Sequence, residues 1–467
     1  MSQDTPHGAV YNDPNAVLRA FAANRAFRAA EWSELTTEDN PYRRPVRPDD
    51  LAWLDYSRPM PVEKSLRLSN LLGHRMLRNV YDLDALFLTP KPSEAVEADR
   101  QAFYNDDNRM LSAMAKPILE RHLFTFLEDE RDELPSTTLD AVDRYVAEHL
   151  QQRTAEPGSA FATVTATKGR KEATNFLLLQ ISAFRPAVHT AITRAGLGEY
   201  DLAHPRLRQL LTDQHTAWVD ATPTYAAMLK SAGLEPAAAA YWQLYLGSSL
   251  ARGNYMHHLA INREHFFAFL GALVHKLVDE TATRDRLVEV LEDGLGADTT
   301  HLRTLPQLTG TDLSTLVHEL LAPLVERFGQ GVLTDFHRGF ADAAWLARQW
   351  DEDLATQVAW ADRIEEYQEK AEKIQRHLVD EEIDVDLDTF VESEEETSTT
   401  HVHDEHRLVI IEAGQMHFWN NTTHRIELNE GDKLLIPVSR LHGSTVLSGE
   451  CTYHQPIIPE DMFQRFA

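Results

Sequence analysis

The chain has 467 residues, 43% of them hydrophobic and 25% charged, so it is long enough to form roughly two or three domains with separate cores. Its formal net charge of −28 argues against nucleic acid or an anionic membrane as a partner, because both would be repelled. A single cysteine, Cys451, excludes an intramolecular disulfide and any cysteine-rich metal site.

The first residues, MSQDTPHGAVYNDP, have no basic start followed by an apolar run, so they do not resemble a signal peptide. No apolar stretch approaches the roughly 20 residues that a membrane-spanning helix needs. We therefore expect a cytoplasmic protein that has neither a membrane nor a nucleic acid as its partner.

The N-terminal part of the sequence has a helical pattern. Residues 16–35 are rich in alanine and carry apolar residues at helical spacing, and similar patterns return at about 61–82 and 107–130. A loop rich in proline and arginine, NPYRRPVRPDD, separates the first pattern from the second. We predict a helical domain over residues 1–130 that serves in packing or in an oligomer contact.

The middle of the chain is also helical. From about residue 133 to 378 nearly every segment has apolar residues at helical spacing, and glycine or proline ends the segments, as in SAGLEP and FGQG. Several helices of this length joined by short loops are typical of a helical bundle. We place this bundle at residues 131–378.

The composition changes after residue 378. Residues 379–398 are strongly acidic and predict a linker. In residues 399–467, β-branched and aromatic residues alternate with polar ones, and tight turns such as NEGD and LSGE separate the segments, which predicts an all-β domain. The predicted fold class is multidomain α + β: an all-α N-terminal domain and a helical bundle, followed by a small all-β domain.

Three histidines define a candidate metal site in the β segment. His401 and His403 lie two residues apart on a predicted strand, so their side chains point to the same side of the sheet. His442 follows after a Gly-Asp turn and a short apolar strand. This pattern resembles the cupin family, whose small β-barrels hold a metal ion in the barrel mouth.

The cupin resemblance extends to the turns and has one departure. Gly414, Gly431 and Pro437 fall where the two family motifs have their glycines and proline. The position of the usual glutamate ligand holds Arg407 instead. The resemblance therefore implies a metal site made of three histidines alone.

The chemistry of such a site follows from its donors. Three neutral imidazoles leave coordination positions open for a substrate and O2, so iron(II) is the expected metal. Zinc is the alternative, because three histidines and a water also form a hydrolytic zinc site. By strand alternation Arg407 faces the barrel interior, where it would hold a substrate carboxylate or form a salt bridge to a carboxylate of the barrel. Tyr453, on the closing strand, is expected to line the substrate pocket.

The remaining histidines of the β segment are not predicted to be among the three main metal ligands. His406 has the opposite parity to His401 and His403 on the strand, so we expect it to be exposed. His417, His424 and His454 are alternative fourth donors to the metal.

The helical bundle resembles the haem-oxygenase-like diiron family over about residues 190–345. The match rests on RAGLGEYD followed by HPRL, on FLGALVHKLVDET and on DLSTLVHE. The resemblance implies metal ligands at Glu199, His204, Glu280 and His318. It places Thr311 and Thr315 where the family has a histidine and an aspartate, and threonine is a poor substitute for either donor. Either the bundle has lost a working diiron site and is now a scaffold or substrate shuttle, or it still binds iron through other ligands.

The combination of the three parts resembles the N-nitrosourea-forming synthases of the streptozotocin pathway over essentially the whole chain. The resemblance implies that the first helical block forms a homodimer, that a diiron bundle hydroxylates the guanidine nitrogens of N-methyl-arginine, and that the cupin iron rearranges the product and forms an N–N bond.

We predict a non-haem iron and O2-dependent oxygenase of specialised metabolism that acts at the cupin site. Its expected substrate is a small, nitrogen-rich amino acid that is already N-hydroxylated. Two alternatives stay open: a full N-hydroxylating synthase in which both metal sites act on an arginine derivative, and a non-catalytic metal-binding cupin that serves as a scaffold or sensor.

Overall fold

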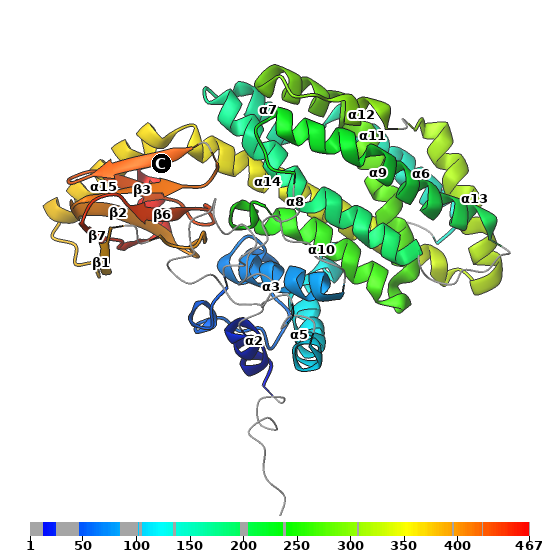
Figure 1. The fold of residues 1–467 in the computed structure, drawn as a ribbon, viewed down its shortest axis with the longest axis horizontal. Coiled ribbons are helices and arrows are strands. Elements are labelled where there is room, and N and C mark those ends of the chain that lie inside the picture. Colours follow the sequence, from blue (N-terminus) through cyan, green and yellow to red (C-terminus); the bar gives the residue numbers. More distant parts are fainter. Residues whose placement is uncertain are drawn as a thin grey trace, which may run out of the picture.

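The computed structural model describes most of the chain, namely residues 13–24, 46–84, 101, 105–133, 137–196, 204–236, 240–305, 308–394, 397–422 and 424–466. Figure 1 shows a large helical part, an antiparallel β domain beside it, and a group of N-terminal helices below them. Among the described residues, no helix is both long enough and apolar enough to cross a membrane.

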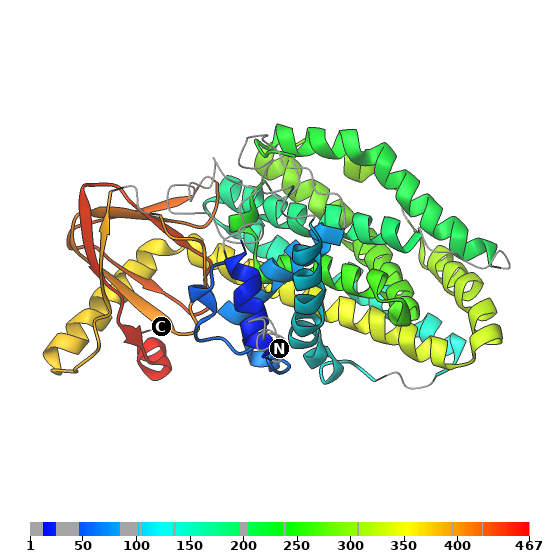
Figure 2. The same cartoon turned by 60° about the horizontal axis from the view of Figure 1, so that its bottom comes forward.

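The N-terminal part contains α2 (Pro14–Ala23), α3 (Leu68–Asp84) and α5 (Asp106–Phe124), with short 3-10 turns between them. Asp13 caps α2 by accepting a hydrogen bond from the Asn15 backbone, and Asn105 caps α5 in the same way, which satisfies N–H groups that a helix leaves free at its start. Helix α3 packs against α5 on one side and against a helix of the bundle on the other. In Figure 2 these helices come forward, between the β domain and the bundle.

The bundle is built from long helices of the middle of the chain. Its helices are α6 (Leu139–Ala155), α7 (Ser159–Ala166), α8 (Arg170–Gly196), α9 (Pro205–Ser231), α10 (Gly247–Ile261), α11 (Phe266–Leu295), α12 (Thr300–Thr304), α13 (Gly310–Phe328) and α14 (Gly331–Ala361). Helices α11 and α14 approach closely at Gly271 and Gly339. The approach is so close that a Cβ on either glycine would collide with a backbone carbonyl of the other helix. Their apolar faces share one core with α3 and α5.

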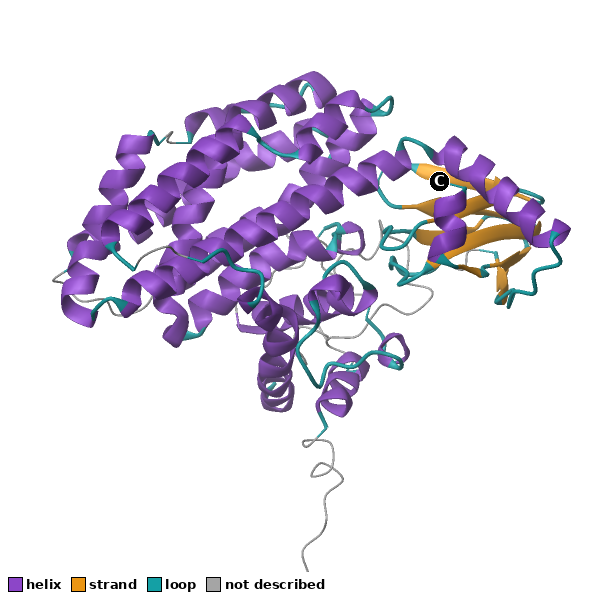
Figure 3. Cartoon of the chain, turned by 180° about the vertical axis from the view of Figure 1, so that it is seen from behind, coloured by secondary structure: helices purple, strands orange, loops and turns teal. Residues whose placement is uncertain are grey.

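The β domain consists of two antiparallel sheets. Its strands are β1 (Thr389–Ser393), β2 (His406–Ala413), β3 (Gln415–Trp419), β4 (Arg425–Asn429), β5 (Lys433–Ile436), β6 (Gly443–Val446), β7 (Glu450–His454) and β8 (Ile457–Ile458). One sheet has the order β1-β7-β2-β5, with β8 paired to β2, and the other has the order β4-β3-β6. Figure 3 shows these strands at one end of the molecule, with helices beside them.

Helix α15 (Ile364–Asp380) joins the bundle to the β domain and packs against β5. Its buried face, which includes Tyr367, Ile374 and Leu378, shares a core with residues of both sheets. A short helix at the end of the chain, α16 (Glu460–Arg465), follows β8. The helical and β parts are therefore in direct contact through packed apolar side chains.

The structure confirms the predicted fold class, since helices occupy the first part of the chain and antiparallel sheets the last. The predicted turns at Gly414 and Gly431 have φ of +86° and +90°, a region that favours glycine. Residues 389–393, inside the predicted acidic linker, form strand β1 and pair with β7. The predicted limits of the individual domains remain predictions.

Candidate metal centre

The three predicted histidines meet where two segments of the β domain pair. His401 and His403 lie just before β2, and His442 lies just before β6. An isolated antiparallel bridge joins His401 to His442, with N···O distances of 2.9 and 3.1 Å between their backbones. The Ser439 backbone N–H donates to the His403 carbonyl at 3.0 Å, so the second segment also holds the third histidine.

The side chains of the three histidines converge. Each offers one ring nitrogen, and these nitrogens lie within 4.8 Å of one another. The ring centroids are 4.8 Å apart for His401 and His403, 4.6 Å for His401 and His442, and 5.1 Å for His403 and His442. Within the described part of the chain, this is the group of His, Cys, Asp or Glu side chains arranged to hold a metal ion.

Hydrogen bonds orient two of the rings and select their tautomer. The Nδ1–H of His401 donates to the Thr399 carbonyl at 2.9 Å, and the Nδ1–H of His442 donates to the Arg440 carbonyl at 2.9 Å. Each ring therefore presents the lone pair of its Nε2. Such backbone bonds behind a metal-binding imidazole fix its orientation and raise its basicity.

The inward-facing nitrogens are left without partners by the protein. Nε2 of His403 and Nε2 of His442 are both buried and have no hydrogen-bond partner. A buried polar atom without a partner is costly, and in native proteins it calls for a specific explanation such as a bound ion. A metal ion among the three rings would supply that partner.

Burial also keeps these rings neutral. It lowers the pKa of His401, lowers that of His403 well below its ordinary value, and lowers that of His442 to about 3. Neighbouring His401 and His442, together with the positive charge of Arg407, lower the pKa of His403 further. At neutral pH all three imidazoles therefore carry the free lone pairs that a metal ion requires.

Helix α14 of the bundle holds the segment that carries His442. The Gln357 side chain donates to the Ser439 carbonyl at 2.7 Å and accepts from the Leu441 backbone N–H at 3.1 Å. Asp353, one turn earlier, accepts from the same Gln357 amide at 2.9 Å and so orients it. All of these groups are buried.

Helix α3 holds the segment that carries His401 in a similar way. The fully buried Arg75 donates to the Thr400 carbonyl at 2.7 Å and to the Thr400 hydroxyl at 2.8 Å. The Leu68 backbone N–H donates to the Asp404 carboxylate at 3.1 Å. The sequence analysis missed Gln357 and Arg75, and no local pattern marks them, because their partners lie far away along the chain.

Arg407 lies on β2 near the three histidines and forms ion pairs with carboxylates. Its guanidinium pairs with Asp388 at 2.9 Å and with Glu405 at 3.8 Å, and it donates to the Gln455 carbonyl at 3.0 Å. Salt bridges of the kind considered as the alternative are therefore present. The Nε of Arg407 is buried without a hydrogen-bond partner, so one donor stays free.

Tyr453 is buried on β7 and turns toward the edge strand β1. Its hydroxyl donates to Glu392 at 2.9 Å, and its ring stacks on Phe390 with a centroid distance of 5.3 Å. Burial and the adjacent Glu392 carboxylate raise the pKa of Tyr453 far above its ordinary value, so the phenol stays protonated. Its predicted place in the lining of a substrate pocket remains a prediction.

The expectation that His406 is exposed is wrong. His406 is only 5% exposed, its Nε2 lies 2.8 Å from Glu460, and its Nδ1 accepts from the Val438 backbone at 3.2 Å. Its ring stacks on Phe463 of α16 with a centroid distance of 3.8 Å. Strand parity did not apply here, because His401 and His403 lie before β2 and bends separate them from His406, and the C-terminal helix covers the His406 side chain.

The alternative fourth donors lie outside the three-histidine group. His454 contacts the Thr389 hydroxyl at 2.9 Å and Glu412 at 3.4 Å. His424 lies 3.3 Å from the side chain of Asn420 in the turn before β4. His417 is on β3, in register with Glu427 of β4.

Among the described residues, the ligands implied for the bundle are not gathered into a metal group. Glu199 lies outside the described residues. His204 starts α9 and bonds through Nε2 to the Leu320 carbonyl at 2.8 Å, while His318 contacts Asp143 at 3.5 Å. Thr311 and Thr315 are exposed on α13.

Glu280 is half-buried in the bundle and is paired with cations. Its carboxylate pairs with Lys276 at 2.9 Å and with Arg185 at 3.4 Å, and these charges lower the pKa of Glu280 against the effect of burial. The neighbouring Asp279 pairs with Arg153 at 2.9 Å and with Arg252 at 2.8 Å. These carboxylate oxygens are held by cations, so the described residues here do not fit a diiron site.

The fold and the site together define a class: a multidomain α + β protein whose C-terminal antiparallel β domain carries a three-histidine group able to hold a metal ion. A scan against known protein families finds no match.

The chain is 31% identical over 422 residues to a nitrosourea synthase from Streptomyces achromogenes subsp. streptozoticus, and the match covers 89% of each chain. It therefore belongs to the nitrosourea synthase family and is an enzyme, which confirms the predicted resemblance.

Proposed function

We propose that this enzyme is an iron(II)- and O2-dependent oxygenase that forms an N–N bond at the three-histidine site of its cupin-type β domain. The observation that carries the proposal is the convergence of three neutral histidines, two of which turn a buried, unpartnered Nε2 toward the others. The relative is named for making a nitrosourea, a product with an N–N bond. The proposed substrate is a small, nitrogen-rich amino acid that is already N-hydroxylated.

The donor set suits iron. His401, His403 and His442 would hold the metal, and three neutral imidazoles leave coordination positions for O2 and for the substrate. Joining two N–H nitrogens breaks both N–H bonds and releases two electrons and two protons, which reduce one O2 to hydrogen peroxide. The protein keeps the rings neutral by burial and holds their orientation through the Thr399 and Arg440 carbonyls.

The surrounding residues supply the means to bind an amino acid. Arg407 keeps a free Nε, and a guanidinium donor is well suited to a substrate carboxylate. Its two carboxylate partners, Asp388 and Glu405, limit how far the guanidinium moves. We assign Arg407 to carboxylate binding and Tyr453 to shaping the pocket wall.

The charged residues of the bundle support the proposal that this chain does not itself hydroxylate the substrate. Asp279 and Glu280 are paired with four cations and are not available as ligands for two irons. We therefore propose that N-hydroxylation of the substrate is carried out by another enzyme, and that the chemistry of this chain is confined to the β domain. The expected homodimer, formed through the N-terminal helices, remains a prediction that light scattering would test.

The test is the substitution His442→Ala, with His454→Ala as a matched control on β7. Iron content and O2 consumption are measured on the full chain with an N-hydroxylated arginine derivative. We expect about one iron per chain in the wild type and in H454A, and loss of both iron and O2 consumption in H442A. Unchanged iron in H442A, or stoichiometric zinc in place of iron, would contradict the proposal.

A further inference from the structure

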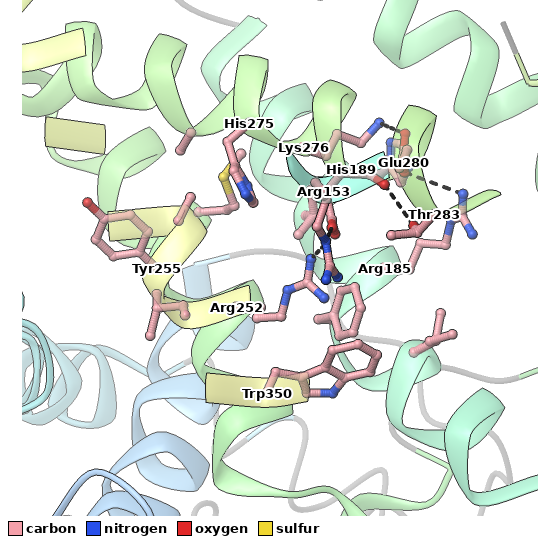
Figure 4. Close-up of a pocket in the computed structure, with 18 of the residues that line it drawn as sticks. Arg153, Arg185, His189, Arg252, Tyr255, His275, Lys276, Glu280, Thr283 and Trp350 are labelled. Carbon is pink, nitrogen blue, oxygen red and sulfur yellow. Dashed lines mark hydrogen bonds and ion pairs between the residues drawn. The ribbon is translucent and has the colours of Figure 1, made fainter. Parts of the chain in front are cut away.

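The helical bundle contains a cavity of about 90 Å3, distant in sequence from the three-histidine group. Residues of α6, α7, α8, α10, α11 and α14 line it. In Figure 4 Lys276, Glu280 and Arg185 lie at the upper right, and Trp350 lies at the bottom. A volume of this size accommodates several water molecules or a small organic molecule.

Among the residues that line the cavity, cationic side chains outnumber anionic ones. Four are cationic, namely Arg153, Arg185, Arg252 and Lys276, and two are anionic, namely Asp279 and Glu280. Figure 4 shows Glu280 between Lys276 and Arg185. Every carboxylate has two cationic partners, and two positive charges remain in excess. Excess charge away from water is unfavourable unless a counter-ion compensates it.

Two donors in this cavity have no partner in the protein. Arg185 and His189 are 7% and 6% exposed, and they are one turn apart on the same face of α8. The Nε of Arg185 and the Nδ1 of His189 are buried without a hydrogen-bond partner. The His189 ring is fixed by stacking on Trp218 at a centroid distance of 4.2 Å. The Nε–H of Arg185 is a donor, and Nδ1 of His189 is a donor in the tautomer that carries the ring proton there, so in that tautomer both match a ligand that accepts hydrogen bonds.

Aromatic rings hold another cation of the cavity in place. The Arg252 guanidinium lies 4.1 Å from the centroid of Phe184 and 5.1 Å from that of Trp350, and it also donates to Asp279. Rings on one side and a carboxylate on another fix the guanidinium before any ligand arrives. The apolar rings also provide a wall for the non-polar part of a ligand.

From these observations we infer that the cavity binds a small organic anion through carboxylate groups, without a metal ion. The two excess positive charges match a dicarboxylate, and the free donors of Arg185 and His189 match carboxylate oxygens. A divalent metal would add positive charge to an already cationic cavity. This inference is independent of the function proposed for the β domain.

The test is isothermal titration calorimetry of succinate into the full-length wild-type protein. Succinamide, the neutral diamide of the same length, and inorganic phosphate serve as comparison ligands. We expect saturable succinate binding that is at least roughly tenfold weaker in Arg185→Gln, because a hydrogen bond to a charged group is lost. Arg286→Gln, on the exposed surface of α11, is the matched control and should bind as the wild type does.

A second variant guards against a failure of Arg185→Gln to fold. His189→Phe keeps an aromatic ring against Trp218 but removes the donor, and it should weaken succinate binding while leaving the far-UV circular dichroism unchanged. No saturable succinate binding by the wild type, equal binding of succinamide, binding of phosphate but not of succinate, or equal weakening in R286Q would each overturn the inference.

Discussion

The β domain and the helical bundle each gather several ligand-type side chains in a buried place, yet the two groups are arranged in opposite ways. In the β domain three histidines turn ring nitrogens toward one another, and no protein group meets Nε2 of His403 or of His442. In the bundle, Asp279 and Glu280 are each held by two cations. The number of donor side chains alone does not identify a metal site. A metal site is indicated when the protein leaves those donors without partners of its own.

The physical reason lies in charge. A histidine can be buried as a neutral ring at modest cost, and burial itself lowers its pKa. A carboxylate stays charged unless its pKa rises greatly, so a buried one needs cations or a metal nearby. In this chain Asp279 and Glu280 have cations, and these cations keep both carboxylates ionised against the effect of burial, which alone would raise their pKa.

The largest expected effect is on the stability of the bundle. Asp279→Ala leaves Arg153 and Arg252 buried without their carboxylate and should lower the free energy of unfolding by about 3–5 kcal/mol. Urea denaturation measures the change. The control Glu289→Gln removes an exposed carboxylate that pairs with Arg286 and should cost less than about 1 kcal/mol. An equally small effect of D279A would mean that the cations of the bundle do not depend on Asp279.

The next effect tests whether the β-domain site depends on the bundle. Gln357→Leu removes the hydrogen bonds to Ser439 and Leu441 that hold the His442 segment, so metal affinity should fall by roughly 10–100-fold. Competition with a chelator measures this affinity. Gln349→Leu makes the same change on the same helix, at a residue bonded to Ser65, and should leave the affinity as it is. Equal metal binding in both variants would show that the β domain forms its site alone.

The two regions should also respond to acid in different pH ranges. The pKa of His442 falls from near 6.5 in the unfolded chain to about 3 in the folded one, so the unfolded state binds this proton more readily. Its contribution to stability is complete above pH 6.5 and is lost as the pH falls toward 3. Asp279 has a lowered pKa instead, so its contribution is lost only below about pH 3.9, its unfolded value.

Urea unfolding of metal-free protein between pH 6.5 and 4.5 separates these contributions. Because His442 no longer titrates in His442→Ala, the slope of stability against pH should be shallower there by up to about 1.4 kcal/mol per pH unit. His454→Ala is the control, and its slope should stay closer to that of the wild type. Identical slopes for H442A and the wild type would mean that His442 is not buried in its neutral form.

The smallest expected effect concerns the edge of the β domain. Tyr453→Phe removes the hydrogen bond to Glu392 and leaves that carboxylate without it, so the free energy of unfolding should fall by about 1 kcal/mol. Thermal denaturation and iron content are measured together. The stability should change while the iron content does not, because the hydroxyl is directed to β1. Loss of iron in Y453F would place Tyr453 closer to the metal than its observed contacts indicate.

Much of the fold could be predicted because its signals are local. Helical spacing of apolar residues in the first part of the chain and strand alternation in the last predicted the observed order of elements. The HVH sequence and the later His442, which resemble the cupin motifs, predicted the three-histidine group. The predicted strand at His401 and His403 was wrong, because these residues lie before β2 and are held to the His442 segment by an isolated bridge. The environment of His406 was missed because α16, which covers it, lies far later in the chain and no strand pattern predicts where that helix packs.

The sequence by itself determined the class of fold, because helical and strand periodicity are local, and it indicated the three histidines of the candidate metal centre through their resemblance to the cupin motifs. Only the tertiary structure decided the pairing of Asp279 and Glu280 with the arginines of α6, α8 and α10, and the hydrogen bonds by which Gln357 and Arg75 hold the histidine segments. These contacts join residues far apart in the chain. No local pattern encodes them, because they depend on how whole helices pack against one another and against the β domain.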